Sequence, residues 1–276
     1  MPGVVTRNAT QKRFGYQWTH FDDVVPEFEE HFQRLIHPLP PADFAGKVVL
    51  DAGCGYGRYA LCAAKYGAQV VGMDFSEAIQ AARRITRHTN IELVRGDIFN
   101  PPFKPYFDMV MSIGVLHHLP DPLQGFAQLA AVVKPGGMIV LWLYSAQRRL
   151  SNFFLEQLRK AVRPLPNRAL HGLSFLLAIP DFIVAKGLKL LPQNRYKRFI
   201  PTHFQLYADL PFSTSWADWF DRLGAPIRHY YTREELSAWL KHIGAEGEVY
   251  PTEDFGWTLV ARLGVGRDQN GSMLSS

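Results

Sequence analysis

Residues 47–59 read Lys-Val-Val-Leu-Asp-Ala-Gly-Cys-Gly-Tyr-Gly-Arg-Tyr, and we expect the rest of the chain to be arranged around them. The apolar, β-branched run at 48–50 is typical of a strand buried on both faces. The three glycines that follow remove side chains from a turn, and residues 58–65 read as a helix. A ligand that approaches this turn would lie near the partially positive N-terminus of that helix.

The spacing of the glycines decides between two kinds of nucleotide site. A dinucleotide-binding turn needs Gly-x-Gly-x-x-Gly, but the sixth position counted from Gly53 is Arg58, which cannot supply the close packing of the third glycine. The pattern is instead acidic-x-Gly-x-Gly-x-Gly, with Asp51 as the acidic residue. This pattern resembles motif I of the class I S-adenosylmethionine (SAM)-dependent methyltransferases.

Two more acidic residues follow the next two predicted strands. The run 68–73 ends in Asp74, and the run 91–94 is followed closely by Asp97. A carboxylate placed like Asp74 can accept hydrogen bonds from both ribose hydroxyls, although a charge at a helix N-terminus is an alternative role. The resemblance implies that Asp97 meets the adenine amino group and that SAM is the cofactor. We expect these cofactor-binding residues: Asp51, Gly53, Cys54, Gly55, Gly57, Asp74, Phe75, Asp97, Ile98, Ser112 and Ile113.

The loop at 114–122 reads Gly-Val-Leu-His-His-Leu-Pro-Asp-Pro and follows a predicted fourth strand at 107–112. It resembles the branch of the family that includes quinone-biosynthesis methyltransferases. His118 and His117 are the catalytic candidates, because a histidine here can line the acceptor pocket or act as a base. The alternative is a buried histidine that tethers the loop. We expect no metal, because no second cluster of His, Cys or carboxylates has ligand spacing.

The tetrapeptide Asn100-Pro-Pro-Phe103 resembles the signature of methyltransferases that act on amide or exocyclic nitrogens. In those enzymes the signature ends the fourth strand. Here it comes one loop too early, before that strand begins. We therefore do not expect it to contribute to the site.

The order of the predicted elements indicates an α/β fold with a Rossmann-like, doubly wound sheet of seven strands, mostly parallel, whose last strand is antiparallel. A capping box at 232–235 opens a helix, and runs at 246–250 and 257–263 supply the last two strands. We divide the chain into an N-terminal aromatic and helical cap (1–45), a SAM-binding core (46–145), a helical lid inserted after the fifth strand (146–230), the completion of the core (231–264) and a disordered tail (265–276).

Within this scheme three local features are less regular. Residues 1–13 are polar and expected to be frayed, and a helix is predicted from Pro26 to Ile36. In the lid, residues 173–179 and 182–191 predict two short helices broken at Pro180.

The composition suits a globular cytoplasmic protein. The chain has 276 residues, 47% of them hydrophobic, and two cysteines, which fits a reducing compartment. The first ten residues lack the apolar segment of a secretory signal, and we expect no run of 18 apolar residues that could span a bilayer.

Positive charge is concentrated in one segment of the chain. Between Ala146 and Ile200 there are eleven Lys or Arg and only two acidic residues, Glu156 and Asp181, so this segment has a net charge of +9. The whole chain has a net charge of +5, so the rest of it has a net charge of −4. Such a segment suggests an anionic substrate or surface, and a solvated helical face is the simpler alternative.

Aromatic residues near both ends of the core suggest the acceptor pocket, with packing as the alternative. The candidates for acceptor binding are Tyr16, Trp18, Trp216, His229 and Tyr230. The basic residues of the lid alternate with aliphatic runs, which favours a small apolar or amphiphilic acceptor. The same pattern also fits a protein that binds this acceptor at an anionic membrane surface. A methyltransferase for RNA or protein that uses the basic insertion, and a silent SAM-binding protein, are the alternatives. The acceptor atom, whether O, N or C, and the oligomeric state are left open.

Overall fold

A computed structural model describes residues 2–21, 28–147, 149–188, 190, 204, 207–252 and 255–264. Its centre is a seven-stranded sheet of order β3-β2-β1-β4-β5-β7-β6, in which only β7 runs antiparallel to its neighbours. The predicted Rossmann-like fold is therefore confirmed. The strands are β1 (Val48–Ala52), β2 (Gln69–Asp74), β3 (Glu92–Arg95), β4 (Phe107–Ile113), β5 (Val133–Tyr144), β6 (Glu246–Thr252) and β7 (Gly256–Arg262).

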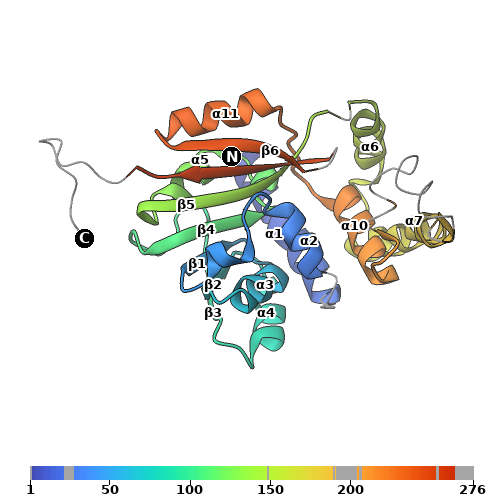
Figure 1. Ribbon diagram of the computed structural model, residues 1–276. Coiled ribbons are helices and arrows are strands. Elements are labelled where there is room, and N and C mark those ends of the chain that lie inside the picture. Colours follow the sequence, from blue (N-terminus) through green and yellow to red (C-terminus); the bar gives the residue numbers. More distant parts are fainter. Residues whose placement is uncertain are drawn as a thin grey trace, which may run out of the picture.

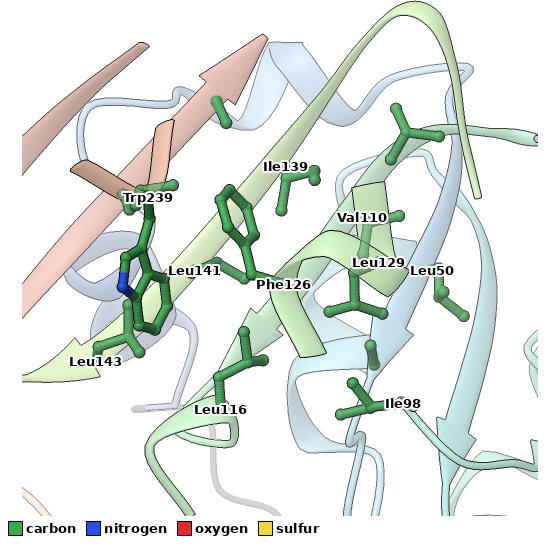
Figure 2. Close-up of a cluster of buried hydrophobic side chains, with 14 of the residues drawn as sticks. Leu50, Ile98, Val110, Leu116, Phe126, Leu129, Ile139, Leu141, Leu143 and Trp239 are labelled. Atoms are coloured by element: carbon green, nitrogen blue, oxygen red, sulfur yellow. The ribbon is translucent and has the colours of Figure 1, made fainter. Parts of the chain in front are cut away.

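Side chains alternate between the two faces of this sheet, and each face is covered by helices (Figure 1). On β5, Ile139 and Leu141 pack beneath α5 (Pro122–Ala130) and α11 (Arg233–His242), where Phe126 and Trp239 complete one core (Figure 2). The neighbouring β5 residues turn to the other face. There they meet α2 (Phe28–Leu35), the 3-10 turn η1 (Pro41–Phe44) and α3 (Arg58–Lys65). Burial on both faces explains why these strands are continuously apolar.

The N-terminal segment is more ordered than its polarity predicts. Helix α1 extends from Pro2 to His20, so the expectation of a frayed stretch over 1–13 is wrong. The helix crosses the carboxyl ends of β1 and β2, because Gln11 donates a 3.0 Å hydrogen bond to the Phe75 carbonyl and Trp18 lies against Gly55. Tertiary contact with these strand ends, rather than an apolar stripe, therefore holds α1 in place.

Three helices occupy the described part of the insertion: α6 (Arg149–Val162), α7 (Asn167–Leu188) and α10 (Phe212–Gly224). They share a small core with α1 that is separate from the sheet. The predicted break at Pro180 is wrong, because α7 continues through it. Leu170, Ser174, Ala178 and Ala185 form one buried stripe along the helix, and this packing on both sides of Pro180 outweighs the hydrogen bond that proline cannot donate.

Helix α7 also corrects the expectation that no segment is long and apolar enough to span a bilayer, since its 22 residues pass that test by length and composition. Helix α4 (Ala78–Thr86) and the 3-10 turn η2 (Leu116–His118) complete the elements around the sheet. The capping box opens α11, where Thr232 and Glu235 cap each other's backbone N–H groups. The predicted tail at 265–276 lies outside the described residues.

Candidate active site

A cavity of about 870 Å³ lies at the carboxyl ends of β1, β2, β4 and β5. In an open parallel sheet this edge is where ligands bind, because strand order reverses between β1 and β4. Helix α1 and the inserted helices α6 and α10 close the cavity from above. Eight of the predicted cofactor residues line it together: Gly53, Cys54, Gly55, Asp74, Phe75, Asp97, Ile98 and Ile113.

The turn after β1 requires glycine at its first position. Gly53 has a φ of 83°, and a Cβ there would lie 2.5 Å from Val115. Its N–H donates a 2.7 Å hydrogen bond to the Met73 carbonyl, which ties the turn to β2. The backbone of the turn is therefore exposed to the cavity without covering side chains.

The second and third acidic residues lie on the cavity wall at successive strand ends. Asp74 accepts hydrogen bonds from the Gly55 N–H at 2.9 Å and from the Ser76 N–H and hydroxyl at 2.7 and 2.6 Å. Asp97 accepts a hydrogen bond from the Phe99 N–H at 3.1 Å. A carboxylate has about four acceptor positions, so Asp74 keeps capacity for a bound hydroxyl.

Three of the predicted cofactor residues lie below the cavity wall rather than on it. Asp51 is 2% exposed, with one oxygen unpartnered among the described residues. Burial, together with the nearby Asp74 carboxylate, raises the pKa of Asp51 to about 7. Ser112 is fully buried and donates to the Ala52 carbonyl at 2.6 Å, and Gly57 packs against α4. These three residues lie beneath the glycine turn, and their part in binding the cofactor stays a prediction.

Arg58 is a residue that sequence reasoning treated only as the start of a helix. Its guanidinium carbon lies 4.5 Å from the ring centre of Tyr59 and 5.3 Å from that of Trp18, and further rings at Phe28 and Tyr56 complete a cage. All of these side chains line the cavity. No carboxylate of the described chain lies within salt-bridge distance of Arg58, so among these residues the guanidinium beside the glycine turn is surrounded by rings rather than paired with an acidic side chain.

The histidine pair divides into one cavity residue and one core residue. His118 lines the cavity, and its Nδ1 lies 2.7 Å from the Ile227 carbonyl oxygen. Because that oxygen can only accept, Nδ1 carries the proton and Nε2 is left as an acceptor. Burial lowers the pKa of His118 to about 4, and Asp221, whose Oδ1 lies 3.9 Å from Nε2, opposes that shift. His118 is therefore neutral at about pH 7.

His117 is corrected to a core residue. Its ring is fully buried, lies 3.9 Å from the ring centre of Tyr144, and has no hydrogen-bond partner among the described residues. Burial lowers its pKa well below the usual range. It faces no part of the cavity wall, so it cannot act as a base on an acceptor there.

Two of the five predicted acceptor residues, Trp18 and Tyr230, line the cavity, and three do not. Tyr16 stacks on His20 with a centroid distance of 4.0 Å, and Trp216 donates to the His171 carbonyl at 2.9 Å. His229 bonds the Leu119 carbonyl at 3.1 Å. The expected contact with an acceptor is thus corrected to packing and loop tethering for these three.

Sequence reasoning missed a polar cluster that the inserted helices bring to the cavity. The Tyr144 hydroxyl donates to Asp221 Oδ2 at 2.8 Å, and the Arg228 guanidinium lies 4.1 Å from the Tyr144 ring centre. These three residues and His118 line one region of the wall. Asp221 and Arg228 lie more than a hundred residues after His118, and no local spacing links them.

The fold and this arrangement match known proteins. Residues 50–141 match the family described as a methyltransferase domain. The ubiquinone biosynthesis O-methyltransferase of Thiobacillus denitrificans is 40% identical over 127 residues, 44% of this chain and 55% of that protein. That of Vibrio campbellii is 31% identical over 165 residues, 56% of this chain and 70% of that protein. This chain therefore spans little more than half the length of the first of these relatives.

Among solved structures, magnesium protoporphyrin IX methyltransferase from Synechocystis PCC 6803 with bound SAH has a TM-score of 0.54 at 15% identity, over 95% of this chain and 100% of that one. At that identity the likeness shows the fold. Together, fold, glycine turn and relatives define a class I SAM-dependent methyltransferase. The chain belongs to this family and is related to its ubiquinone-biosynthesis branch.

The residues present fit SAM as cofactor. The glycine turn leaves room that a Cβ would fill, and carboxylates stand at two successive strand ends. Among the described residues, one buried Asp51 oxygen lacks a partner, and no carboxylate meets the Arg58 cation at salt-bridge distance. SAM carries a sulfonium, an ammonium and a carboxylate. The site therefore offers carboxylates for the positive groups of SAM and the Arg58 cation for its carboxylate.

Proposed function

We propose that this protein transfers the methyl group of SAM to a hydroxyl of a small, mostly apolar or amphiphilic acceptor. The observation that carries the proposal is the state of His118, a residue of the cavity wall: its Nδ1 donates to the Ile227 carbonyl at 2.7 Å, which leaves Nε2 as an acceptor. A hydroxyl must lose its proton as it becomes an ether, whereas an amine can be methylated without a base. A buried neutral histidine in this place therefore favours an oxygen acceptor.

His118 would act together with the polar cluster around it. Bound SAM supplies the electrophilic methyl group. His118 Nε2 takes the proton of the acceptor hydroxyl, and the Asp221 carboxylate at 3.9 Å stabilises the imidazolium that forms. Tyr144 holds Asp221 through a 2.8 Å hydrogen bond. The remaining contribution is alignment of donor and acceptor in a water-poor cavity.

The cofactor is proposed to lie along the glycine turn. In this arrangement Asp74 binds the ribose hydroxyls, Asp97 meets the adenine and Arg58 binds the carboxylate of the methionine portion. The position of Arg58 supports the last assignment, because it lies one residue past the turn and Trp18, one of its cage rings, also lies 3.5 Å from the Cβ position of Gly55. A carboxylate bound there would neutralise a largely buried cation.

The acceptor class rests on the upper wall of the cavity. Phe14 from α1, Leu155 from α6 and Trp219 from α10 give it an apolar surface, and the Phe14 ring lies tilted against the His118 ring with 4.8 Å between their centres. Relatives named as ubiquinone biosynthesis O-methyltransferases make an amphiphilic aromatic hydroxyl the first class to test. We propose that residues 146–230 act as a lid that selects the acceptor, since they supply most of this wall.

The test is a SAM-dependent assay on a panel of catechols and quinols with short and long apolar chains, with unfractionated tRNA as the competing substrate. We expect methyl ethers from the phenolic panel and loss of turnover in His118→Asn, with bound cofactor retained. Methylated RNA without phenolic products would instead support the RNA-modifying alternative. Methylation of the phenols at an unchanged rate in His118→Asn would contradict the role of His118 as the base for an oxygen acceptor.

A further inference from the structure

Large hydrophobic side chains are exposed on the inserted helices far more than elsewhere. Of the eleven that are exposed in the described part of the chain, nine lie between residues 150 and 190 and only Phe75 and Tyr106 lie on the core. Contiguous exposed apolar surface of this kind marks an interaction site on a soluble domain. Figure 1 shows α6 and α7 at the same end of the molecule.

The exposed residues of α6 form one stripe. Leu150, Phe153, Phe154 and Leu158 are 76%, 57%, 68% and 39% exposed and recur at helical spacing. Gln157 and Ala161, exposed among these residues, carry no charge, and Lys160, exposed seven residues after Phe153, places a cation at the edge of the stripe. A helix face that meets only water normally carries charged residues at such positions.

Helix α7 shows a second uncharged stripe. Its exposed positions include Leu176, Pro180 and Ile183, with Gly172 and Gly187 at either end. The opposite side of α7 packs in the insertion, and the Trp216 indole donates to the His171 carbonyl at 2.9 Å. One face of α7 is thus committed to protein, which suits a helix that lies on a bilayer rather than one that crosses it.

Cations flank these stripes. Lys160 and Arg163 are exposed at the end of α6, and Arg168 is exposed at the start of α7. The acidic Glu156 of α6 pairs with Arg159, which is buried. The exposed side of this region is therefore apolar with a basic edge.

The same stripe forms the mouth of the cavity. Phe154 and Leu158 are both exposed to solvent and part of the cavity wall, and Leu155 continues that wall inward. The exposed face and the cavity wall thus share two apolar residues, Phe154 and Leu158.

We propose that the α6 stripe, with the exposed face of α7 beside it, docks on an anionic phospholipid bilayer, and that the acceptor enters the cavity from the bilayer between Phe154 and Leu158. The route of the acceptor rests on the proposed function; the docking does not. A second copy of the chain fits this face less well. Lipid phosphates complement the cations of the basic edge, Lys160 and Arg163, whereas the same face of a second copy would offer them apolar residues and further cations.

The docking is tested by co-sedimentation of the full chain with vesicles of phosphatidylcholine alone and of phosphatidylcholine mixed with phosphatidylglycerol. We expect binding to the mixed vesicles and about tenfold or greater loss in Leu150→Glu/Phe153→Glu, which places two charges in the apolar contact. Lys160→Gln/Arg163→Gln should lose about fivefold per removed cation and only on anionic vesicles. Tyr106→Glu, an equally exposed aromatic position on the core, is the matched control and should bind like the wild type.

Binding of SAH by each variant, measured in solution, shows that the variants fold and separates this inference from the proposed function. Wild-type vesicle binding by Leu150→Glu/Phe153→Glu overturns the inference, and so does a wild-type chain that binds SAH but no vesicles. A concentration-dependent dimer that the same variant abolishes, with no vesicle binding, overturns it in favour of a second copy. A higher methylation rate for a long-chain phenol in mixed vesicles, lost in this variant while a soluble phenol is methylated normally, supports the entrance route.

Discussion

The backbone N–H of Gly55 lies 2.9 Å from Asp74 Oδ2, so the middle of the glycine turn is bound to the end of the neighbouring strand. The other oxygen of Asp74 accepts two hydrogen bonds from Ser76 at the start of the next helical segment. One carboxylate therefore sets the distance between turn and strand end, and it faces the cavity while doing so.

Replacing Asp74 should lower cofactor affinity more than it lowers stability. A charge-assisted hydrogen bond contributes roughly 1.5–3 kcal/mol, so we expect Asp74→Ala to weaken SAH binding by about tenfold or more in calorimetry. Glu234→Ala, which removes an exposed carboxylate from α11, is the control. An affinity within about twofold of wild type would rule out the ribose assignment.

Removing the Arg58 cation should affect only ligands that carry a carboxylate. We expect Arg58→Gln to weaken SAH binding by about tenfold to a hundredfold, for the loss of a charged hydrogen bond, and to leave binding of 5′-methylthioadenosine unchanged, because this ligand lacks the amino-acid portion. Arg83→Gln on the exposed side of α4 is the control. Equal losses for both ligands would mean that Arg58 only supports the fold of the cage.

The loss of His118 should appear in turnover and not in cofactor binding. The amide of His118→Asn can still donate to the Ile227 carbonyl but cannot act as a base, so we expect kcat to fall by about 10² to 10⁴ with SAH affinity retained. Because the pKa of His118 is about 4, the wild-type rate should show no loss from this group until the pH falls through that value. A fall in rate with a midpoint near the ordinary histidine pKa of about 6.5 would contradict this assignment, as would a variant with wild-type turnover. His242→Asn, at the exposed end of α11, controls for a general effect of the substitution.

Binding of SAM should release protons through Asp51. Burial raises the pKa of this carboxyl to about 7, above its value of about 3.9 in an unfolded chain, so near neutral pH part of the folded population holds the proton. The sulfonium of SAM adds positive charge and favours the carboxylate, which lowers the pKa and expels the proton. SAH lacks that charge and should release less.

The measurement is calorimetry at about pH 7 in buffers that differ in ionisation enthalpy. The difference between SAM and SAH should disappear in Asp51→Asn. The same proton release for both ligands in the wild type would mean that Asp51 does not sense the sulfonium.

The local sequence pattern was sufficient to predict most strands of the sheet and the residues on the cofactor side of the site. Each parallel strand is buried on both faces, so it appears as a continuous apolar run, and the residue after it comes to the same edge as its neighbours. That rule predicts that Gly53, Asp74 and Asp97 lie close together, and all three line the cavity. Pattern was misleading at Pro180 and over 1–13, where contacts with distant residues outweigh local preference.

The acceptor side depended on tertiary structure. His117 and His118 are neighbours in sequence and equally plausible as bases, but the η2 turn sends one ring into the core and the other to the cavity. Asp221 and Arg228 reach His118 only because α10 packs over the end of β5, and no periodicity encodes that contact. The chain thus specifies its cofactor turn through short-range spacing, whereas the charge, protonation and apolar mouth of the acceptor cavity arise only when helices distant in sequence pack together and exclude water.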